Sequence, residues 1–176
     1  MKSHGDTDGY KRRAAPANPM TDGDGTMPAE AAALVQAYIE RHHDFLAWLD
    51  TRVDRIERGR VTLTVPYDEK LTNRTPEWRD ENDVGPGMHG GVAATLVDTA
   101  GGIAQRTAFD DPLAGGVSTV NLNVNYLRRA GGDLTATAEV VRSGSSIGVS
   151  SVTVETPTEE GTEAVATGQA AYRLFR

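Results

Sequence analysis

The stretch from residue 85 to residue 102, GPGMHGGVAATLVDTAGG, constrains the fold more than any other part of the sequence. Apolar residues recur at helical spacing from residue 89 to residue 108, which predicts a helix. The face of this helix that should pack into a core consists of Val92, Leu96, Ala100 and Ile103. The second face is mostly small and consists of Ala94, Asp98, Gly101 and Gln105. A glycine inside a helix costs about 1 kcal/mol relative to alanine, so Gly101 and Gly102 indicate that another backbone passes close by.

The same stretch contains a G-x-G-x-x-G pattern at Gly85, Gly87 and Gly90, which is typical of dinucleotide-binding loops. That function requires a buried parallel strand directly before the loop, and the preceding residues, EWRDEND, cannot form one. A P-loop is excluded because the sequence has no Gly-Lys-Ser or Gly-Lys-Thr. The glycines therefore do not predict a nucleotide-binding fold.

The residues upstream of this helix predict a first helix, two strands and a long loop. Residues 28–50 form an amphipathic pattern, and the core face expected for it consists of Ala31, Leu34, Val35 and Tyr38. Val53 and Ile56 indicate one strand, and residues 61–65 indicate a second strand after a turn near Gly59. Residues 68–88 are polar and irregular, which predicts a loop.

The residues after the central helix predict four strands joined by short turns, which should pair antiparallel. In the first strand, one face should carry Val120, Leu122, Val124 and Tyr126, and the other Thr119, Asn121, Asn123 and Asn125. The second strand should bury Leu134, Ala136, Ala138 and Val140. In the third strand the alternation slips between Val149 and Val152, which predicts a bulge. The expected class is α+β.

Length and composition bound the possible functions. The 176 residues suffice for one domain, and the sequence has neither an apolar run near the ~20 residues of a membrane span nor a cysteine. The formal net charge is −7, and because the charges of residues 1–27 cancel, the excess lies in residues 28–176. An acidic body without a basic stripe argues against nucleic acid as a partner. We expect residues 1–27 to be a disordered extension and residues 28–176 to be the domain.

Asp98 is the least expected residue of the central helix. It lies about two turns from the helix start, too deep to cap it, and a carboxylate on an apolar helix is costly to bury without partners. It is either a surface or structural residue or a carboxylate at a reaction centre. His89, Gly90 and Gly91 favour the second interpretation, because unobstructed N–H groups at a helix start can stabilise a developing oxyanion. Glycines that only form a turn are the alternative.

The segment HGGVAATLVDTAGGIA resembles the central-helix signature of hotdog-fold acyl-CoA thioesterases of the phenylacetate-degradation (PaaI-like) type. His89, Gly90, Gly91 and Asp98 fall at the spacing of that family. The following GGVSTVNLNVNYLRRA resembles the family's next strand, and the resemblance extends from about residue 45 to residue 176. It implies a hotdog fold, in which an antiparallel sheet wraps around a central helix.

The resemblance also implies hydrolysis of an acyl-CoA to a free acid and CoA without a cofactor or metal. The expected location is the cytoplasm, with which the absence of cysteine agrees. The Gly90 N–H would polarise the thioester carbonyl, His89 would shape that site, and Asp98 of the other subunit would act as general base or nucleophile. The subunits would form a homodimer or homotetramer with active sites at the dimer interface. The further residues implied are Ser118 and Asn82 for catalysis, and Gly91, Thr99, Arg142, Ser143 and Gly144 for substrate binding, the last three near the CoA phosphates.

Two departures from the family pattern stand out. The family Asn six residues before the histidine is replaced by Asp83, so either Asn82 or Asn73 fills that role. Arg129 stands where the family usually has a proline, and it either changes only the surface or adds a phosphate contact.

Other features and functions rank lower. His42 and His43 are adjacent and have no third ligand nearby, so we expect solvated side chains and no metal site. Trp48 is expected in the core and Trp78 as a loop anchor, and the asparagine row of the first strand after the helix is expected at a subunit interface. The alternative functions are a hotdog module that binds acyl-CoA without turnover, and a hotdog dehydratase or hydratase.

Overall fold

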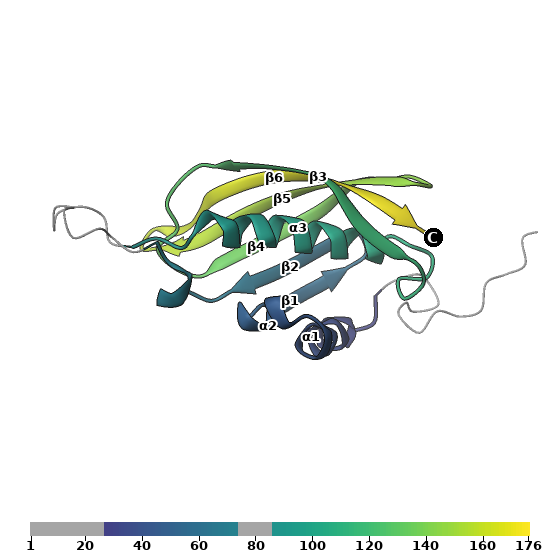
Figure 1. Ribbon diagram of the computed structural model, residues 1–176, viewed down its shortest axis with the longest axis horizontal. Coiled ribbons are helices and arrows are strands. Elements are labelled where there is room, and N and C mark those ends of the chain that lie inside the picture. Colours follow the sequence, from purple (N-terminus) through teal and green to yellow (C-terminus); the bar gives the residue numbers. More distant parts are fainter. Residues whose placement is uncertain (1–26, 74–85) are drawn as a thin grey trace, which may run out of the picture.

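A six-stranded antiparallel sheet curves around one long helix, α3, as Figure 1 shows. The computed structural model describes residues 27–73 and 86–176. Its helices are α1 (Ala31–His42), α2 (Asp44–Trp48), the 3-10 turn η1 (Glu69–Leu71) and α3 (Gly90–Thr107). Its strands are β1 (Arg52–Glu57), β2 (Arg60–Val65), β3 (Gly116–Tyr126), β4 (Leu134–Ser143), β5 (Ile147–Thr158) and β6 (Gly161–Phe175). The strand order across the sheet is β1-β2-β4-β5-β6-β3. The α+β class and the antiparallel sheet around a central helix are therefore confirmed.

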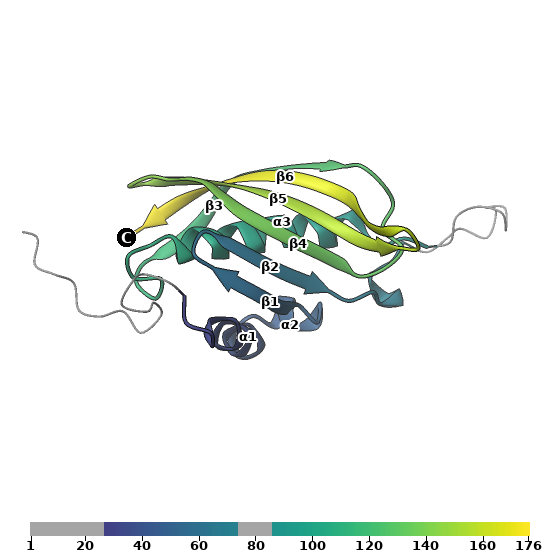
Figure 2. The same ribbon diagram turned by 180° about the vertical axis from the view of Figure 1, so that it is seen from behind.

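The core lies between α3 and the inner face of the sheet. Val92, Leu96 and Ala100 of α3 are buried there, with Ile103 packed against them, so the predicted stripe is confirmed. The residues predicted for the second strand after the helix also face this core, with Leu134, Ala136 and Ala138 buried and Val140 partly buried. From behind, no described helix covers the outer face of the sheet (Figure 2). The core therefore consists mainly of two layers, the sheet and α3, and Ala31 of α1 joins it at the β1 end.

The N-terminal helix differs from its prediction in two ways. It breaks at His43 into α1 and α2, and the predicted extension of residues 1–27 lies outside the described residues except for Met27. Ala31 and Ile39 face β1 and are buried, but Leu34 is 52% exposed and Tyr38 is 57% exposed. The predicted core face was wrong in Leu34 and Tyr38, because the stripe that packs on the sheet is the i, i+4, i+8 row from Ala31.

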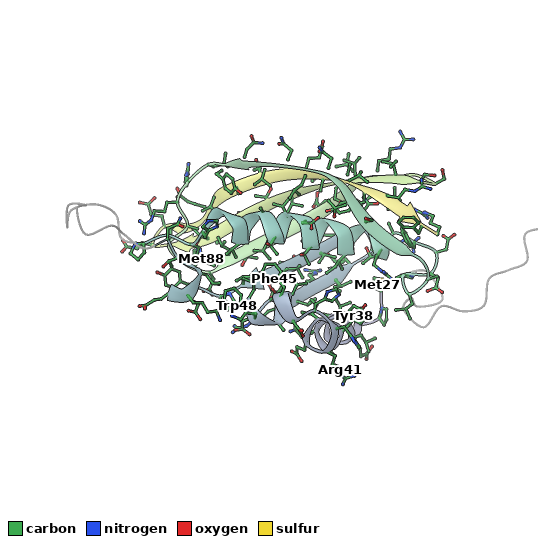
Figure 3. All side chains as sticks on the ribbon, in the orientation of Figure 1. Met27, Tyr38, Arg41, Phe45, Trp48 and Met88 are labelled. Carbon is green, nitrogen blue, oxygen red and sulfur yellow. The ribbon has the colours of Figure 1, made fainter. Side chains whose placement is uncertain are left out.

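The aromatic residues of these two helices lie at the surface. Figure 3 labels Tyr38, Phe45 and Trp48, which come from α1 and α2. Trp48 is 54% exposed, and the Lys70 Nζ atom lies 5.1 Å from its ring centroid. The prediction of Trp48 as a core residue was therefore wrong, since an ammonium group and not the core covers its ring. Trp78 lies outside the described residues.

The sequence predicts one bulge, in β5, whereas the structure has bulges in β3 and β4. In the pairing of β3 with β6 the register shifts between Thr119 and Asn121, so Val120 is the extra residue. Thr119 consequently stands opposite Tyr172 and faces α3, which corrects the predicted alternation. No slip occurs between Val149 and Val152 of β5, since the extra residue there is Val141, on the neighbouring strand β4.

Candidate active site

Three short segments fix the point where α3 begins. The Met88 N–H donates to the Ala130 carbonyl at 2.9 Å, and the His89 N–H donates to the Leu71 carbonyl at 2.7 Å. The Asn73 N–H donates to the Gly87 carbonyl at 3.1 Å. The segment that contains Leu71 and Asn73, and the segment between β3 and β4 that contains Ala130, therefore hold the residues at the start of α3 in place.

His89 is the N-cap of α3. Its Nδ1 atom accepts a hydrogen bond of 2.9 Å from the Gly91 N–H, and its carbonyl accepts one of 2.9 Å from the Val92 N–H. Among the described residues the Gly90 N–H has no acceptor. It lies at the positive end of the helix dipole, where a developing negative charge on an oxygen is stabilised. The first turn of α3 can therefore polarise a carbonyl.

Tyr126 of β3 packs on this first turn. Its hydroxyl donates to the Gly90 carbonyl at 3.1 Å, and a Cβ atom at residue 90 would lie 3.0 Å from its ring. Glycine at residue 90 therefore leaves room for Tyr126 as well as an unobstructed N–H.

Asp98 is half-buried and is held at two points. Its Oδ1 atom accepts a hydrogen bond of 2.6 Å from the Thr119 hydroxyl, and its backbone carbonyl accepts one of 2.9 Å from the Tyr172 hydroxyl. Tyr172 is 1% exposed, and its burial, with the Asp98 charge as a second cause, raises the pKa of its phenol well above the usual value. Tyr172 thus stays protonated as a donor, and the Asp98 carboxylate is fixed through one oxygen.

The helical glycines make room for this arrangement. A Cβ atom at residue 101 would clash with the Tyr172 hydroxyl and would lie 3.3 Å from the Ser150 Cβ. The Ser150 hydroxyl donates to the Gly101 carbonyl at 3.0 Å and accepts from the Gln105 side chain at 3.0 Å. The close neighbour of α3 is therefore a tyrosine side chain and not the passing backbone that the sequence suggested.

Gly90 and Asp98 do not meet within one chain. They lie eight residues apart on α3, which is a rise of about 12 Å at 1.5 Å per residue. β3 runs antiparallel beside the helix, because Tyr126 contacts Gly90 and Thr119 contacts Asp98. The two candidate groups therefore lie at two separate places along the same helix and strand.

The remaining residues expected at the site lie at separate places in the fold. Gly91 and Thr99 lie on α3, while Arg142 and Ser143 end β4 and Gly144 follows them in the turn. Ser118 pairs with Arg173 in the sheet, and the side chain that donates a hydrogen bond to Asp98 is that of its neighbour Thr119. Asn82 lies outside the described residues, and for Asn73 the structure gives the backbone contact to Gly87.

Sequence reasoning did not find Thr119 or Tyr172. The alternation of β3 assigned Thr119 to the wrong face, because nothing in the sequence indicated the extra residue Val120. A signal for Tyr172 was present in Gly101 and Gly102, which indicated a close neighbour without naming it.

The described part of the chain gives no support for a metal site. No group of three or more histidine, aspartate or glutamate side chains gathers within residues 27–73 and 86–176. Within the same ranges, no helix has the length and apolar character needed to cross a membrane.

The fold and this site together define a hotdog-type α+β protein with a glycine-rich helix start and a carboxylate deeper in the same helix. The family model of the thioesterase superfamily matches residues 86–163. A Halobacterium salinarum protein named "Putative esterase VNG_1336C" is 48% identical over 151 residues, which are 84% of this chain and 94% of that protein. The chain therefore belongs to the thioesterase superfamily.

Two further relatives agree with this assignment. A Saccharolobus solfataricus protein named "Putative esterase SSO2140" is 28% identical over 114 residues, 64% of this chain and 72% of that protein. The crystal structure of a thioesterase family protein from Silicibacter pomeroyi is 28% identical, has a TM-score of 0.64, and is matched over 80% of this chain and 94% of that chain.

Proposed function

We propose that this protein is a cytoplasmic acyl-CoA thioesterase of the PaaI-like type, with Asp98 as general base or nucleophile. The observation that carries the proposal is the 2.6 Å hydrogen bond from Thr119 to Asp98 on the central helix of a thioesterase superfamily chain. This bond orients the carboxylate through Oδ1. Oδ2 accepts no hydrogen bond from another described residue and is available for a water molecule or a substrate carbon.

The free edge of the sheet supports a homodimer as the catalytic unit. The other edge strand, β1, is covered, because the Gln36 side chain accepts from the Val53 N–H and donates to the Thr51 carbonyl. β3 has no such cover within the described residues, and it exposes Val120 and Tyr126 by 58% and 57%. A long apolar edge strand of this kind favours pairing with another strand.

Pairing of two β3 strands would assemble the complete site. In an antiparallel pair around a two-fold axis, the Tyr126 end of one strand lies beside the Thr119 end of the other. In each copy α3 lies alongside β3, with Gly90 next to Tyr126 and Asp98 next to Thr119. Gly90 of one copy therefore approaches Asp98 of the other. The N–H donor and the carboxylate would act on one thioester from two chains.

The chemistry of this pair is hydrolysis. The Gly90 N–H, with His89 and Gly91 forming the turn around it, polarises the thioester carbonyl. As general base, Asp98 takes a proton from water, the water oxygen attacks the carbonyl carbon, and the C–S bond breaks to release the CoA thiolate. As nucleophile, the carboxylate attacks the carbonyl carbon, the C–S bond breaks to release the CoA thiolate, and water then hydrolyses the resulting mixed anhydride to the free acid and the Asp98 carboxylate.

The other residues expected from the sequence have supporting roles in this proposal. Thr99 and Ser118 line the cleft between the two copies, and Arg142, Ser143 and Gly144 contact the CoA moiety. Asn82 or Asn73 assists at the carbonyl.

The test is hydrolysis of a panel of short-chain, long-chain and aromatic acyl-CoAs, followed with a thiol-reactive dye. The protein has no cysteine, so the dye reports only released CoA. We expect the kcat of Asp98→Asn to fall by a factor of about 100 or more, the typical contribution of a general base.

A matched control is available in the same fold. Asp54 accepts a 2.6 Å hydrogen bond from Thr64 on β1 and β2, so Asp54→Asn removes a similar carboxylate at the opposite edge of the sheet from β3. It should retain wild-type kcat. A folded wild-type protein that binds an acyl-CoA but hydrolyses none of the panel would contradict the enzymatic proposal and favour the binding module.

A further inference from the structure

Three polar side chains are buried between α3 and the sheet: Ser150 of β5, Tyr172 of β6 and Gln105 of α3 itself. A buried polar group is costly unless it is hydrogen-bonded, so each of these positions calls for a reason. The two hydroxyls donate to backbone carbonyls of the helix, Ser150 to that of Gly101 and Tyr172 to that of Asp98. The sheet therefore holds the middle of α3 by its backbone, at two carbonyls about one helical turn apart.

The helix backbone is weakest where these hydroxyls bind. Gly101 and Gly102 follow Asp98 by three and four residues, and glycine is the poorest helix former apart from proline. In a regular helix the Asp98 carbonyl accepts from the N–H of residue 102, which in this chain is a glycine. The Tyr172 hydroxyl, at 2.9 Å, is an additional donor to that carbonyl. It therefore fixes the helix at a point where the helix constrains itself least.

Tyr172 and Thr119 are direct partners on the neighbouring strands β6 and β3. Both side chains bind the same residue of α3, since Thr119 donates to the Oδ1 atom of Asp98 and Tyr172 donates to its backbone carbonyl. Residues that stand opposite each other in an antiparallel pair have Cβ atoms about 5 Å apart, so the sheet fixes the spacing of the two donors. Asp98 is therefore bound to one cross-strand pair through both its side chain and its backbone.

The two hydrogen bonds depend on each other. Thr119 has a short side chain, so its hydroxyl reaches the carboxylate only while the backbone of Asp98 keeps its distance from β3. The Tyr172 ring is buried in a small apolar cluster with Phe109, Ala170 and Leu174. Its hydroxyl occupies the space that a Cβ atom at residue 101 would need. A ring that is packed on all sides cannot follow the helix, so it sets the distance between β6 and Asp98.

We propose that Tyr172 is a positioning residue for the hydrolysis, because its hydroxyl holds the backbone of Asp98 so that the carboxylate keeps a single orientation. This inference rests on the proposed function for the reaction that it serves. Thr119 binds the carboxylate itself, whereas Tyr172 acts through the backbone of the same residue. The buried hydroxyl of the last strand thus contributes to the rate without reaching the substrate.

The experiment compares two variants that each lose one buried hydroxyl. Tyr172→Phe removes the hydroxyl on the Asp98 carbonyl and keeps the buried ring. Its matched control is Ser150→Ala, which removes the hydroxyl on the Gly101 carbonyl, three residues further along α3. Gln105, which also donates to Ser150, keeps the Arg142 carbonyl as an acceptor in the control. Because each variant loses one hydrogen bond from the sheet to a helix carbonyl, both should show a similar decrease in Tm.

The kinetic readout is kcat and KM for the acyl-CoA that the wild type hydrolyses best. We expect Tyr172→Phe to lower kcat by about 10-fold with KM little changed, because a displaced reacting group costs rate and not ground-state binding. Ser150→Ala should keep the wild-type kcat. A role limited to stability would lower Tm in both variants and leave kcat of the folded proteins unchanged. Equal losses of kcat in the two variants, or a wild-type kcat in Tyr172→Phe, would overturn the proposal.

A second measurement does not depend on turnover. Three-bond NMR couplings across the Cα–Cβ bond of Asp98 report whether its side chain occupies one staggered rotamer or exchanges between several. We expect one rotamer in the wild type and in Ser150→Ala, and averaging between rotamers in Tyr172→Phe. Averaged couplings in the wild type, or a single rotamer in Tyr172→Phe, would also contradict the positioning role.

The two measurements separate this inference from the proposed hydrolysis. If the wild type hydrolyses no acyl-CoA but the Asp98 couplings change in Tyr172→Phe alone, the orientation of the carboxylate by Tyr172 is supported and hydrolysis fails. If hydrolysis collapses in Asp98→Asn while Tyr172→Phe matches the wild type in kcat and in couplings, the role of Tyr172 fails and hydrolysis stands.

Discussion

At the scale of single residues, the pair Thr119 and Asp98 defines what the carboxylate can do. The Thr119 hydroxyl occupies one carboxylate oxygen at 2.6 Å and so limits the rotation of the side chain. Hydrogen bonds to a charged acceptor are among the stronger ones in proteins, and a carboxylate that must align with a carbonyl carbon depends on such a constraint. Thr119 is a positioning residue in this arrangement.

The change Thr119→Val tests this role while it keeps the β-branched shape. Loss of a hydrogen bond to a charged group costs roughly 1.5 kcal/mol or more, so we expect kcat to fall about 10-fold with KM little changed. A merely structural role would lower stability and leave kcat of the folded fraction unchanged. Thr119→Ser, which keeps the hydroxyl, should restore most of the activity.

Two further variants serve as comparisons for this test. Thr64→Val removes the comparable Thr64–Asp54 hydrogen bond and should leave kcat unchanged. Ser118→Ala measures the role that the family resemblance assigns to the preceding serine. A Thr119→Val protein with wild-type kcat would contradict the positioning role of the threonine.

At the scale of elements, α3 depends on how its first turn is closed. The only side-chain cap of that turn among the described residues is the His89 Nδ1 atom, which accepts from the Gly91 N–H. A Cβ atom at residue 91 would lie 2.9 Å from the same nitrogen, so the cap and the glycine depend on each other. The histidine therefore contributes to stability independently of any catalytic role.

We expect His89→Ala to lower the free energy of unfolding by about 1 kcal/mol, the usual cost of losing an N-cap. For a domain of this size that corresponds to a decrease in Tm of about 2–4 °C, measurable by thermal denaturation. His89→Asn is the control, because asparagine is a good N-cap and should retain most of the stability. Equal Tm values for His89→Ala and wild type would show that this cap adds nothing.

The sequence predicted the positions of helices and strands better than it predicted which of their faces are buried. The helix around residues 89–108 and the strands near Gly59 were found because their periodicity extends over enough residues to be unambiguous. The assignment of faces failed where a local irregularity intervened, at the extra residue Val120, and where two adjacent stripes were both apolar, at Leu34 and Tyr38. Bulges arise from pairing with a distant strand, and a single sequence does not contain that information locally.

The residues of the candidate site also differ in whether the sequence alone could identify them. Gly90 and Asp98 could be found because they break local rules, the first as a glycine that opens a helix and the second as a carboxylate within one. Thr119 obeys local rules and acquires a role only through its contact with Asp98, which is distant in the sequence.

At the scale of the whole molecule, the two edges of the sheet differ. α1 and Gln36 cover β1, whereas β3 ends the sheet with its outward backbone groups uncovered by the described residues. Leu122 and Val120 on this strand are 39% and 58% exposed. A monomer would leave this edge open to uncontrolled pairing, which a symmetric dimer prevents.

The change Leu122→Glu places two like charges near the two-fold axis of the proposed dimer. We expect the mass measured by light scattering after size-exclusion chromatography to fall to that of one chain, 18.8 kDa, with loss of thioester hydrolysis. Thr153→Glu, on the exposed outer face of β5, is the control and should keep the wild-type mass. A monomeric variant with full activity would contradict the shared site.

The contact between Tyr172 and Gly101 also restricts which substitutions related sequences can accept at these two positions. The phenol oxygen lies where a side chain at residue 101 would begin, so any larger residue there is tolerated only after the tyrosine has been replaced by something shorter. That replacement in turn releases the backbone carbonyl of Asp98. Substitutions at these positions must accumulate in a fixed order, and the intermediate step passes through a protein in which Asp98 keeps its hydrogen bond to Thr119 but has lost the one to Tyr172. The two residues should therefore be inherited as a unit.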